Sequence, residues 1–129
     1  MNTKPSFLGG IMNKCKISKS FKFEAAHSLP FLPEGHKCRS IHGHSYEVTV
    51  SFCGDIPDNG MLVDFAEISK VVNPLINLCD HQNLNDVIPF NTTSENIALW
   101  FAHKIKAKIS CLYSVTVSET PTTSATVYA

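Results

Sequence analysis

The sequence lacks the features that mark several large classes of protein. Its 129 residues contain no apolar run near the roughly 18 residues that a membrane-spanning helix needs. Basic and acidic residues are balanced at 11 each, so no positive excess is available for nucleic acid or an anionic lipid surface. There is no Cys-x-x-Cys pair, no internal repeat and no low-complexity linker. These absences argue against a membrane span, a zinc ribbon and a basic nucleic-acid binder.

The cysteines also give little support for a disulfide framework. They are five in number, an odd count, and stand far apart at positions 15, 38, 53, 79 and 111. Residues 1–13 lack the sustained apolar stretch of a signal peptide. We therefore predict a cytoplasmic protein, with an N-terminal extension over residues 1–14 and a single domain over residues 15–129.

Apolar and polar residues alternate in several segments, which is the pattern of half-buried strands. This alternation covers residues 15–27 and 42–53 near the N-terminus. It returns at residues 112–119 and, after a turn, at residues 124–129. With two helices between these pairs, the order ββααββ indicates an α+β fold with a four-stranded antiparallel sheet and helices on one face.

The two helices are predicted from apolar residues at helical spacing and from residues that cap helix N-termini. Asp64 caps the first predicted helix, over residues 65–78, and Pro74 within it predicts a kink or an early end. Thr93 or Thr92 caps the second.

Four polar residues lie on the apolar faces of the predicted strands, all near strand ends. His27 closes the first apolar row, His42 and His44 open the second, and Glu119 closes the third. If consecutive strands pair antiparallel, these ends lie on one rim of the sheet. The topology therefore predicts that three imidazoles and a carboxylate meet.

Three imidazoles match the ligand count of a catalytic zinc ion with one open position. The alternative is that His27 is a core histidine bonded to a carbonyl and that His42-Gly43-His44 is a turn. Cys38, four residues before His42, could move protons near a dication. It could also be a buried inert thiol or the fourth ligand of a structural zinc site.

The pair Asp80-His81 and the residue Glu119 each have both a functional and a structural interpretation. Asp80 precedes His81 and could orient its ring as in an acid–base relay, whereas His81 could equally be a residue favoured by the helix dipole. Glu119 could accept hydrogen bonds from two adjacent N–H donors of a heterocycle, or lie at a solvent-exposed strand end.

The order and spacing of several motifs resemble the 6-pyruvoyl-tetrahydropterin synthase superfamily, over about residues 17–128. Within it, the spacing Cys-x-x-x-His-Gly-His is most similar to the 6-carboxy-tetrahydropterin synthase branch of the queuosine pathway. The motifs that carry the resemblance are Phe23-Glu24-Ala25-Ala26-His27, Cys38-Arg39-Ser40-Ile41-His42-Gly43-His44, Asp80-His81-Gln82-Asn83-Leu84-Asn85, Thr93-Ser94-Glu95-Asn96 and Glu119-Thr120-Pro121-Thr122.

The resemblance implies the tunnelling fold, a sequential antiparallel sheet with two helices on one face, and trimers that stack into a homohexamer. It also implies that zinc is bound by His27, His42 and His44. Glu119 would anchor the pterin ring. Protons would be moved by Cys38 and, from a neighbouring subunit, by Asp80 and His81.

The implied reaction converts 7,8-dihydroneopterin triphosphate to 6-carboxy-5,6,7,8-tetrahydropterin, acetaldehyde and triphosphate. Two alternatives remain open at this point. One is a 6-pyruvoyl-tetrahydropterin synthase of the same fold, and the other is a non-catalytic module that binds a pterin or a metal.

Overall fold

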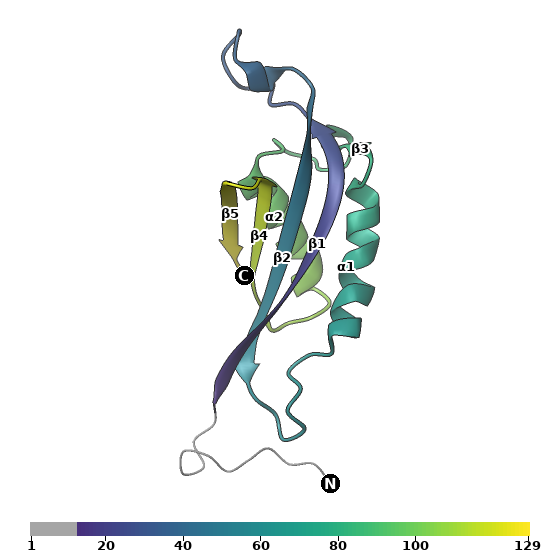
Figure 1. Cartoon of the computed structure of the whole chain (residues 1–129), viewed down its shortest axis with the longest axis vertical. Coiled ribbons are helices and arrows are strands. Elements are labelled where there is room, and N and C mark those ends of the chain that lie inside the picture. Colours follow the sequence, from purple (N-terminus) through teal and green to yellow (C-terminus); the bar gives the residue numbers. More distant parts are fainter. Residues whose placement is uncertain (1–12) are drawn as a thin grey trace.

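A computed structural model describes residues 13–129 of the chain (Figure 1). Most of the predicted N-terminal extension, residues 1–12, lies outside the described residues. Lys14, which was predicted to belong to the extension, is already the first residue of strand β1 (Lys14–His27). No helix of the described part is long and apolar enough to cross a membrane.

The longest feature of the fold is a twisted hairpin of two strands (Figure 1). β1 pairs antiparallel with β2 (His42–Asp55), in a register that runs from Lys14 opposite Asp55 to His27 opposite His42. β4 (Leu112–Thr120) pairs antiparallel with β2, and β5 (Thr123–Tyr128) with β4. The predicted sequential antiparallel arrangement of these four strands is confirmed.

The prediction of a four-stranded, purely antiparallel sheet is nevertheless wrong. A fifth strand, β3 (Gln82–Asn83), pairs parallel with β1 at Ala25 and Ala26 and gives the order β3-β1-β2-β4-β5. The chain leaves the first helix and runs beside β1, where the backbone N–H of His81 donates to the Glu24 carbonyl at 2.6 Å. Two residues are too few to show an alternating pattern, so this strand has no sequence signal.

Two helices, α1 (Phe65–Cys79) and α2 (Ser94–Lys106), cover one face of the sheet (Figure 1). Asp64 caps α1 as predicted, because its Oδ1 accepts from the Ala66 N–H at 2.8 Å. Pro74 does not end α1 early. Its missing N–H removes one helical hydrogen bond. The buried face of α1 nevertheless continues past Pro74, through Ile68, Val72 and Ile76, and the packing of this face offsets the loss.

The core lies between these helices and the sheet. Alternate residues of β1 and β2 are buried there, and the Phe23 and Tyr46 rings stack with centroids 4.9 Å apart. Hydroxyl groups bond in pairs across the other face, such as Ser20 with Thr49 at 2.9 Å. The buried row that begins with Phe21 and Phe23 on β1 ends at His27, so the core leads directly to the predicted rim.

A loop of residues 28–41 joins β1 to β2 and extends beyond the end of the sheet, at the top of Figure 1. It contains the short 3-10 helix η2 (Lys37–Arg39), and the guanidinium of Arg39 donates to the carbonyls of Pro30 and Leu32 at 2.8 and 2.9 Å. A second short helix, η3 (Leu84–Asp86), follows β3. Both segments lie at the end of the sheet that carries the histidines.

Candidate metal centre and active site

Three histidine rings meet at one end of the sheet. His27 and His42 are direct partners across β1 and β2, and His44 lies two residues further along β2 on the same face. One ring nitrogen of each residue lies within 4.8 Å of those of the other two. The ring centroids are between 4.6 and 5.2 Å apart. Strand parity therefore brings these three residues together as predicted, and their role as ligands stays a prediction.

His27 is held as a neutral ring with one nitrogen available. Its Nδ1 lies 2.8 Å from the Thr92 carbonyl oxygen, which can only accept, so Nδ1 carries the proton. Burial lowers the pKa of His27 below its ordinary value and the nearby His42 acts in the same direction, against the raising effect of the Thr92 hydrogen bond. The neutral ring then presents the lone pair of Nε2, which is the form that binds a metal.

The donor set fits a divalent metal such as zinc. Nε2 of His27 is buried and has no hydrogen-bond partner among the described residues, a costly state unless something else pairs with it. His42 is oriented in the same way as His27, because its Nδ1 lies 2.7 Å from the Ser40 carbonyl oxygen. Three imidazole nitrogens leave a tetrahedral ion one open position, the arrangement of catalytic rather than structural zinc.

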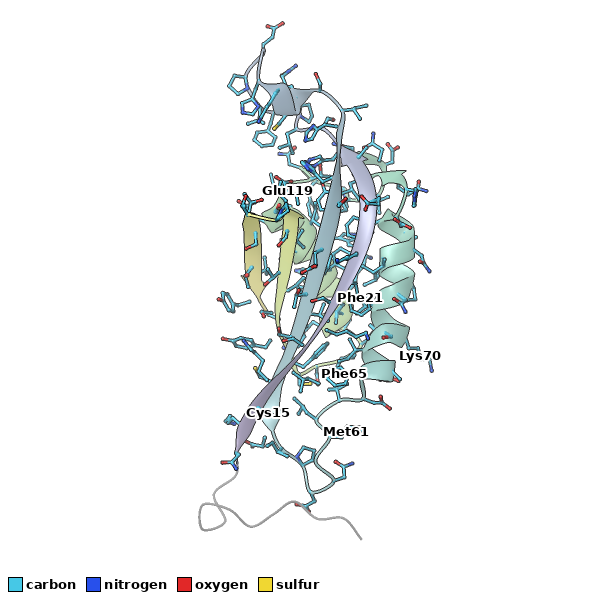
Figure 2. All side chains as sticks on the ribbon, viewed as in Figure 1. Cys15, Phe21, Met61, Phe65, Lys70 and Glu119 are labelled. Atoms are coloured by element: carbon cyan, nitrogen blue, oxygen red, sulfur yellow. The ribbon has the colours of Figure 1, made fainter. Side chains whose placement is uncertain are left out.

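Glu119, near the end of β4, lies beside this cluster. Its Oε2 is 3.8 Å from Nε2 of both His27 and His44, which is too far for a hydrogen bond but places the carboxylate next to two of the three rings. Glu119 and His44 line a cavity of about 640 Å³, a size typical of small-molecule sites. The carboxylate is about one-third exposed and can therefore reach a ligand in that cavity. Figure 2 shows Glu119 at the opposite end of the sheet from Cys15.

Asp80 and His81 form a fixed pair just after α1. Asp80 Oδ2 is 3.0 Å from His81 Nδ1, and its Oδ1 accepts from the Glu24 N–H at 2.9 Å. The Glu24 hydrogen bond lowers the pKa of the Asp80 carboxyl below its ordinary value, and the bond to His81 adds to this. Asp80 is thus an anion at neutral pH, able to orient the ring and stabilise its charged form.

The backbone of His81 supports a functional interpretation of this pair. Its φ is +59°, in the left-handed region that residues other than glycine rarely occupy. Such strain concentrates at functional sites. The side chain is 79% exposed and lines a second cavity, of about 600 Å³, with Glu24 and Ser45. No hydrogen bond or ion pair within the described residues joins Asp80 or His81 to the three histidines.

Cys38 lies in η2, on the loop that extends beyond the sheet. Its backbone N–H donates to His36 Nδ1 at 3.1 Å and its carbonyl accepts from the Leu29 N–H at 2.9 Å, so the backbone is held while the thiol is partly exposed. The group of potential metal ligands that the described residues form contains the three histidines and no cysteine. This favours a three-imidazole site over a structural site closed by Cys38.

Thr92 is a site residue that sequence reasoning missed. It was considered only as a possible helix cap, but the structure shows that Thr93 caps α2 and that Thr92 contacts His27. The sequence signal for Thr92 was that two adjacent threonines precede α2, although one is enough to cap the helix. The Ser40 carbonyl that orients His42 had none, because any residue supplies a backbone carbonyl.

Comparison with known proteins gives consistent matches over nearly the whole chain. Residues 16–129 match the model of the family described as 6-pyruvoyl tetrahydropterin synthase. The chain is 43% identical over 117 residues to a 6-carboxy-5,6,7,8-tetrahydropterin synthase from Synechocystis, covering 84% of this chain and 89% of that protein. It is 33% identical over 96 residues to a dihydroneopterin monophosphate aldolase from Pyrococcus furiosus, covering 74% and 79%.

The fold is also similar to that of a solved structure. The structure of Caenorhabditis elegans 6-pyruvoyl tetrahydropterin synthase superimposes with a TM-score of 0.83 at 29% identity, covering 92% of this chain and 97% of that one. Similar proteins thus carry three different names for their activity, and the choice among them rests on the site.

Proposed function

This chain belongs to the 6-pyruvoyl tetrahydropterin synthase family, and from this premise we propose that it is a zinc-dependent 6-carboxy-tetrahydropterin synthase. The proposed reaction converts 7,8-dihydroneopterin triphosphate to 6-carboxy-5,6,7,8-tetrahydropterin, acetaldehyde and triphosphate, within queuosine biosynthesis. The observation that carries the proposal is the cluster of His27, His42 and His44, with Cys38 four residues before His42. The named relative from Synechocystis supports the choice of product.

The proposed roles follow from the chemistry of each side chain. His27, His42 and His44 hold the metal as neutral imidazoles, and a bound zinc ion supplies a Lewis acid for negative charge that develops on the substrate side chain. Cys38 donates and accepts protons at the carbons of that side chain. His81, oriented by the Asp80 carboxylate, is the second acid–base group.

Glu119 is proposed to anchor the pterin. A carboxylate can accept two parallel hydrogen bonds from the adjacent N–H groups of a guanidine-like ring edge, and such charge-assisted pairs are strong and specific in geometry. Its position 3.8 Å from both His27 and His44 would bring the anchored ring beside the metal ligands. The substrate side chain would then extend toward the cluster.

We propose that the active protein is a homo-oligomer, a hexamer made of two trimers in the cytoplasm. Among residues 13–129, β1 pairs with β3 only at Ala25 and Ala26, and no strand pairs with the outer edge of β5, so most of one sheet edge and all of the other are open to a partner strand. Open edges invite strand pairing between copies. Because no hydrogen bond or ion pair of the described residues joins Asp80 or His81 to the three histidines, we propose that this pair acts in a neighbour's site.

Light scattering at micromolar protein is expected to give the mass of a hexamer of the 14.2 kDa chain. Oligomerisation would complete each site with a second copy of the chain, so it should accompany activity. A monomeric mass under conditions where the protein turns over substrate would contradict the shared site.

Product analysis tests the proposed reaction most directly. The zinc-loaded protein is incubated with 7,8-dihydroneopterin triphosphate, and the pterin and aldehyde products are identified by mass spectrometry. We expect 6-carboxy-tetrahydropterin with an equal amount of acetaldehyde. 6-Pyruvoyl-tetrahydropterin without acetaldehyde would indicate the other synthase of the family, and binding without turnover would indicate a non-catalytic pterin module. Dihydroneopterin monophosphate serves as the comparison substrate because an aldolase for it is among the relatives.

A further inference from the structure

Thr92 is a buried polar residue to which the proposed function gives no role. It is 0% exposed and directly precedes Thr93, whose hydroxyl accepts from the Asn96 N–H at 3.2 Å and caps α2. The Thr92 hydroxyl is therefore not needed at the helix end. It faces His27 instead, with Oγ1 3.1 Å from Nδ1 of the ring.

The directions of the hydrogen bonds around His27 follow from the partners. The Thr92 carbonyl, 2.8 Å from Nδ1, can only accept. The Thr92 hydroxyl lies 3.4 Å from the Ser28 carbonyl and donates there, which leaves an oxygen lone pair toward Nδ1. Both atoms of Thr92 that face the ring are therefore acceptors for one N–H group. An unprotonated Nδ1 would face two acceptors in a buried place, leaving polar groups unpaired.

Asn85 fixes the Ser28 carbonyl from the other side. Its Oδ1 accepts from the Ser28 N–H at 2.9 Å and its Nδ2 donates to the Ser28 carbonyl at 3.0 Å. Asn85 is held in turn by the Asn83 side chain, which accepts from its backbone N–H at 3.0 Å. Because Ser28 directly follows His27, the η3 segment and the loop before α2 meet on the end of β1. The acceptor of the Thr92 hydroxyl is thus set by the fold.

We propose that Thr92 is a positioning residue for His27, which it holds in the Nδ1–H tautomer with the Nε2 lone pair turned toward His42 and His44. The inference rests on the proposed metal site, because a ligand must present a lone pair and not an N–H group. Partners of this kind orient metal-binding histidines and raise their affinity. His42 obtains the same tautomer from the backbone carbonyl of Ser40, which a substitution does not remove. The Nδ1 of His27 also faces a side chain, the Thr92 hydroxyl, and a substitution can remove that group.

Three variants separate positioning from stability. Thr92→Val keeps the branched shape and removes the hydroxyl, and Thr92→Ser keeps the hydroxyl. Thr93→Ala is the matched control, because it removes the neighbouring helix cap without touching His27. The zinc dissociation constant is measured by competition with a chelator. In metal-free wild-type protein, the His27 tautomer is read from long-range proton–nitrogen NMR couplings after selective labelling of histidine.

We expect Thr92→Val to raise the zinc dissociation constant about tenfold, the lower end of the range for lost partners of metal ligands. Thr92→Ser should bind like the wild type, and Thr93→Ala should lower the melting temperature while its zinc affinity is unchanged. Equal zinc affinity in Thr92→Val and wild type, or equal weakening in Thr93→Ala, would overturn the inference.

The tautomer measurement distinguishes this inference from the proposed function. If the wild-type protein binds no zinc, the proposed function fails, and the NMR spectrum alone then decides the role of Thr92. A proton on Nδ1 of His27 in the metal-free protein supports the positioning role, and a proton on Nε2 overturns it. This readout needs no variant, so it still decides the matter if Thr92→Val does not fold.

Discussion

Replacing His42 by alanine is expected to abolish zinc binding and turnover together while the protein stays folded. His42 is the most suitable of the three histidines for this test because it is only partly buried, whereas His27 is 1% exposed and its loss would leave a cavity in the core. Two remaining imidazoles make a poor site for a tetrahedral ion.

The expected loss of zinc affinity and of turnover in His42→Ala can be estimated from the known cost of smaller changes at metal sites. Losing a partner that merely orients a ligand costs about 10- to 100-fold in metal affinity, so losing a ligand should cost more than about 100-fold. A metal that stabilises developing charge contributes several kcal/mol, so turnover should fall by about a thousandfold or more. Zinc content after dialysis and steady-state product formation measure the two effects.

His103→Ala is the control for the His42 experiment. His103 is exposed on α2 and is not part of the histidine cluster, so its variant should keep both zinc and activity. His42→Ala with wild-type zinc affinity would remove the three-histidine site from the proposal. Lost activity with zinc retained would show instead that His42 acts on the substrate and not on the metal.

The place of the metal site was predictable from the sequence because it depends on two simple rules. Side chains alternate between the faces of a strand, and consecutive antiparallel strands bring the end of one beside the start of the next. His27 therefore had to lie opposite the start of β2, and the register places it opposite His42. The same alternation of side chains along β4 predicted the position of Glu119, which lies beside His27 and His44.

Three features that could not be predicted from the sequence depend on tertiary contacts: strand β3, the continuation of α1 and the role of Thr92. β3 has only two residues, and it exists because the Asp80–His81 segment is tied to Glu24 by two hydrogen bonds. The α1 helix continues past Pro74 because packing of its buried face decides against local preference. Thr92 and Thr93 are identical side chains in adjacent positions, and only the position of His27 gives them different roles.

The other large effect is expected from Cys38→Ala, which should keep zinc and lose turnover. Cys38 is outside the histidine cluster, so zinc affinity should stay at the wild-type value. Loss of a positioned proton donor or acceptor should lower kcat by about 10²- to 10⁴-fold. Cys15→Ala is the control, because Cys15 lies at the far end of the sheet from Glu119 (Figure 2) and should change neither quantity. Unchanged turnover in Cys38→Ala would remove Cys38 from the mechanism.

Mixed oligomers of Cys38→Ala chains and His81→Ala chains test whether each site is shared between two subunits. Each variant alone should be nearly inactive, because every site lacks one proton-transfer group. In hybrids made by co-expression, a site that takes Cys38 from one chain and His81 from its neighbour is intact in about one case in four, since each chain has even odds of being the required type. Activity should therefore recover to about a quarter of the wild-type value. If both groups came from the same chain, every site in a hybrid would still lack one of them, and no activity would return.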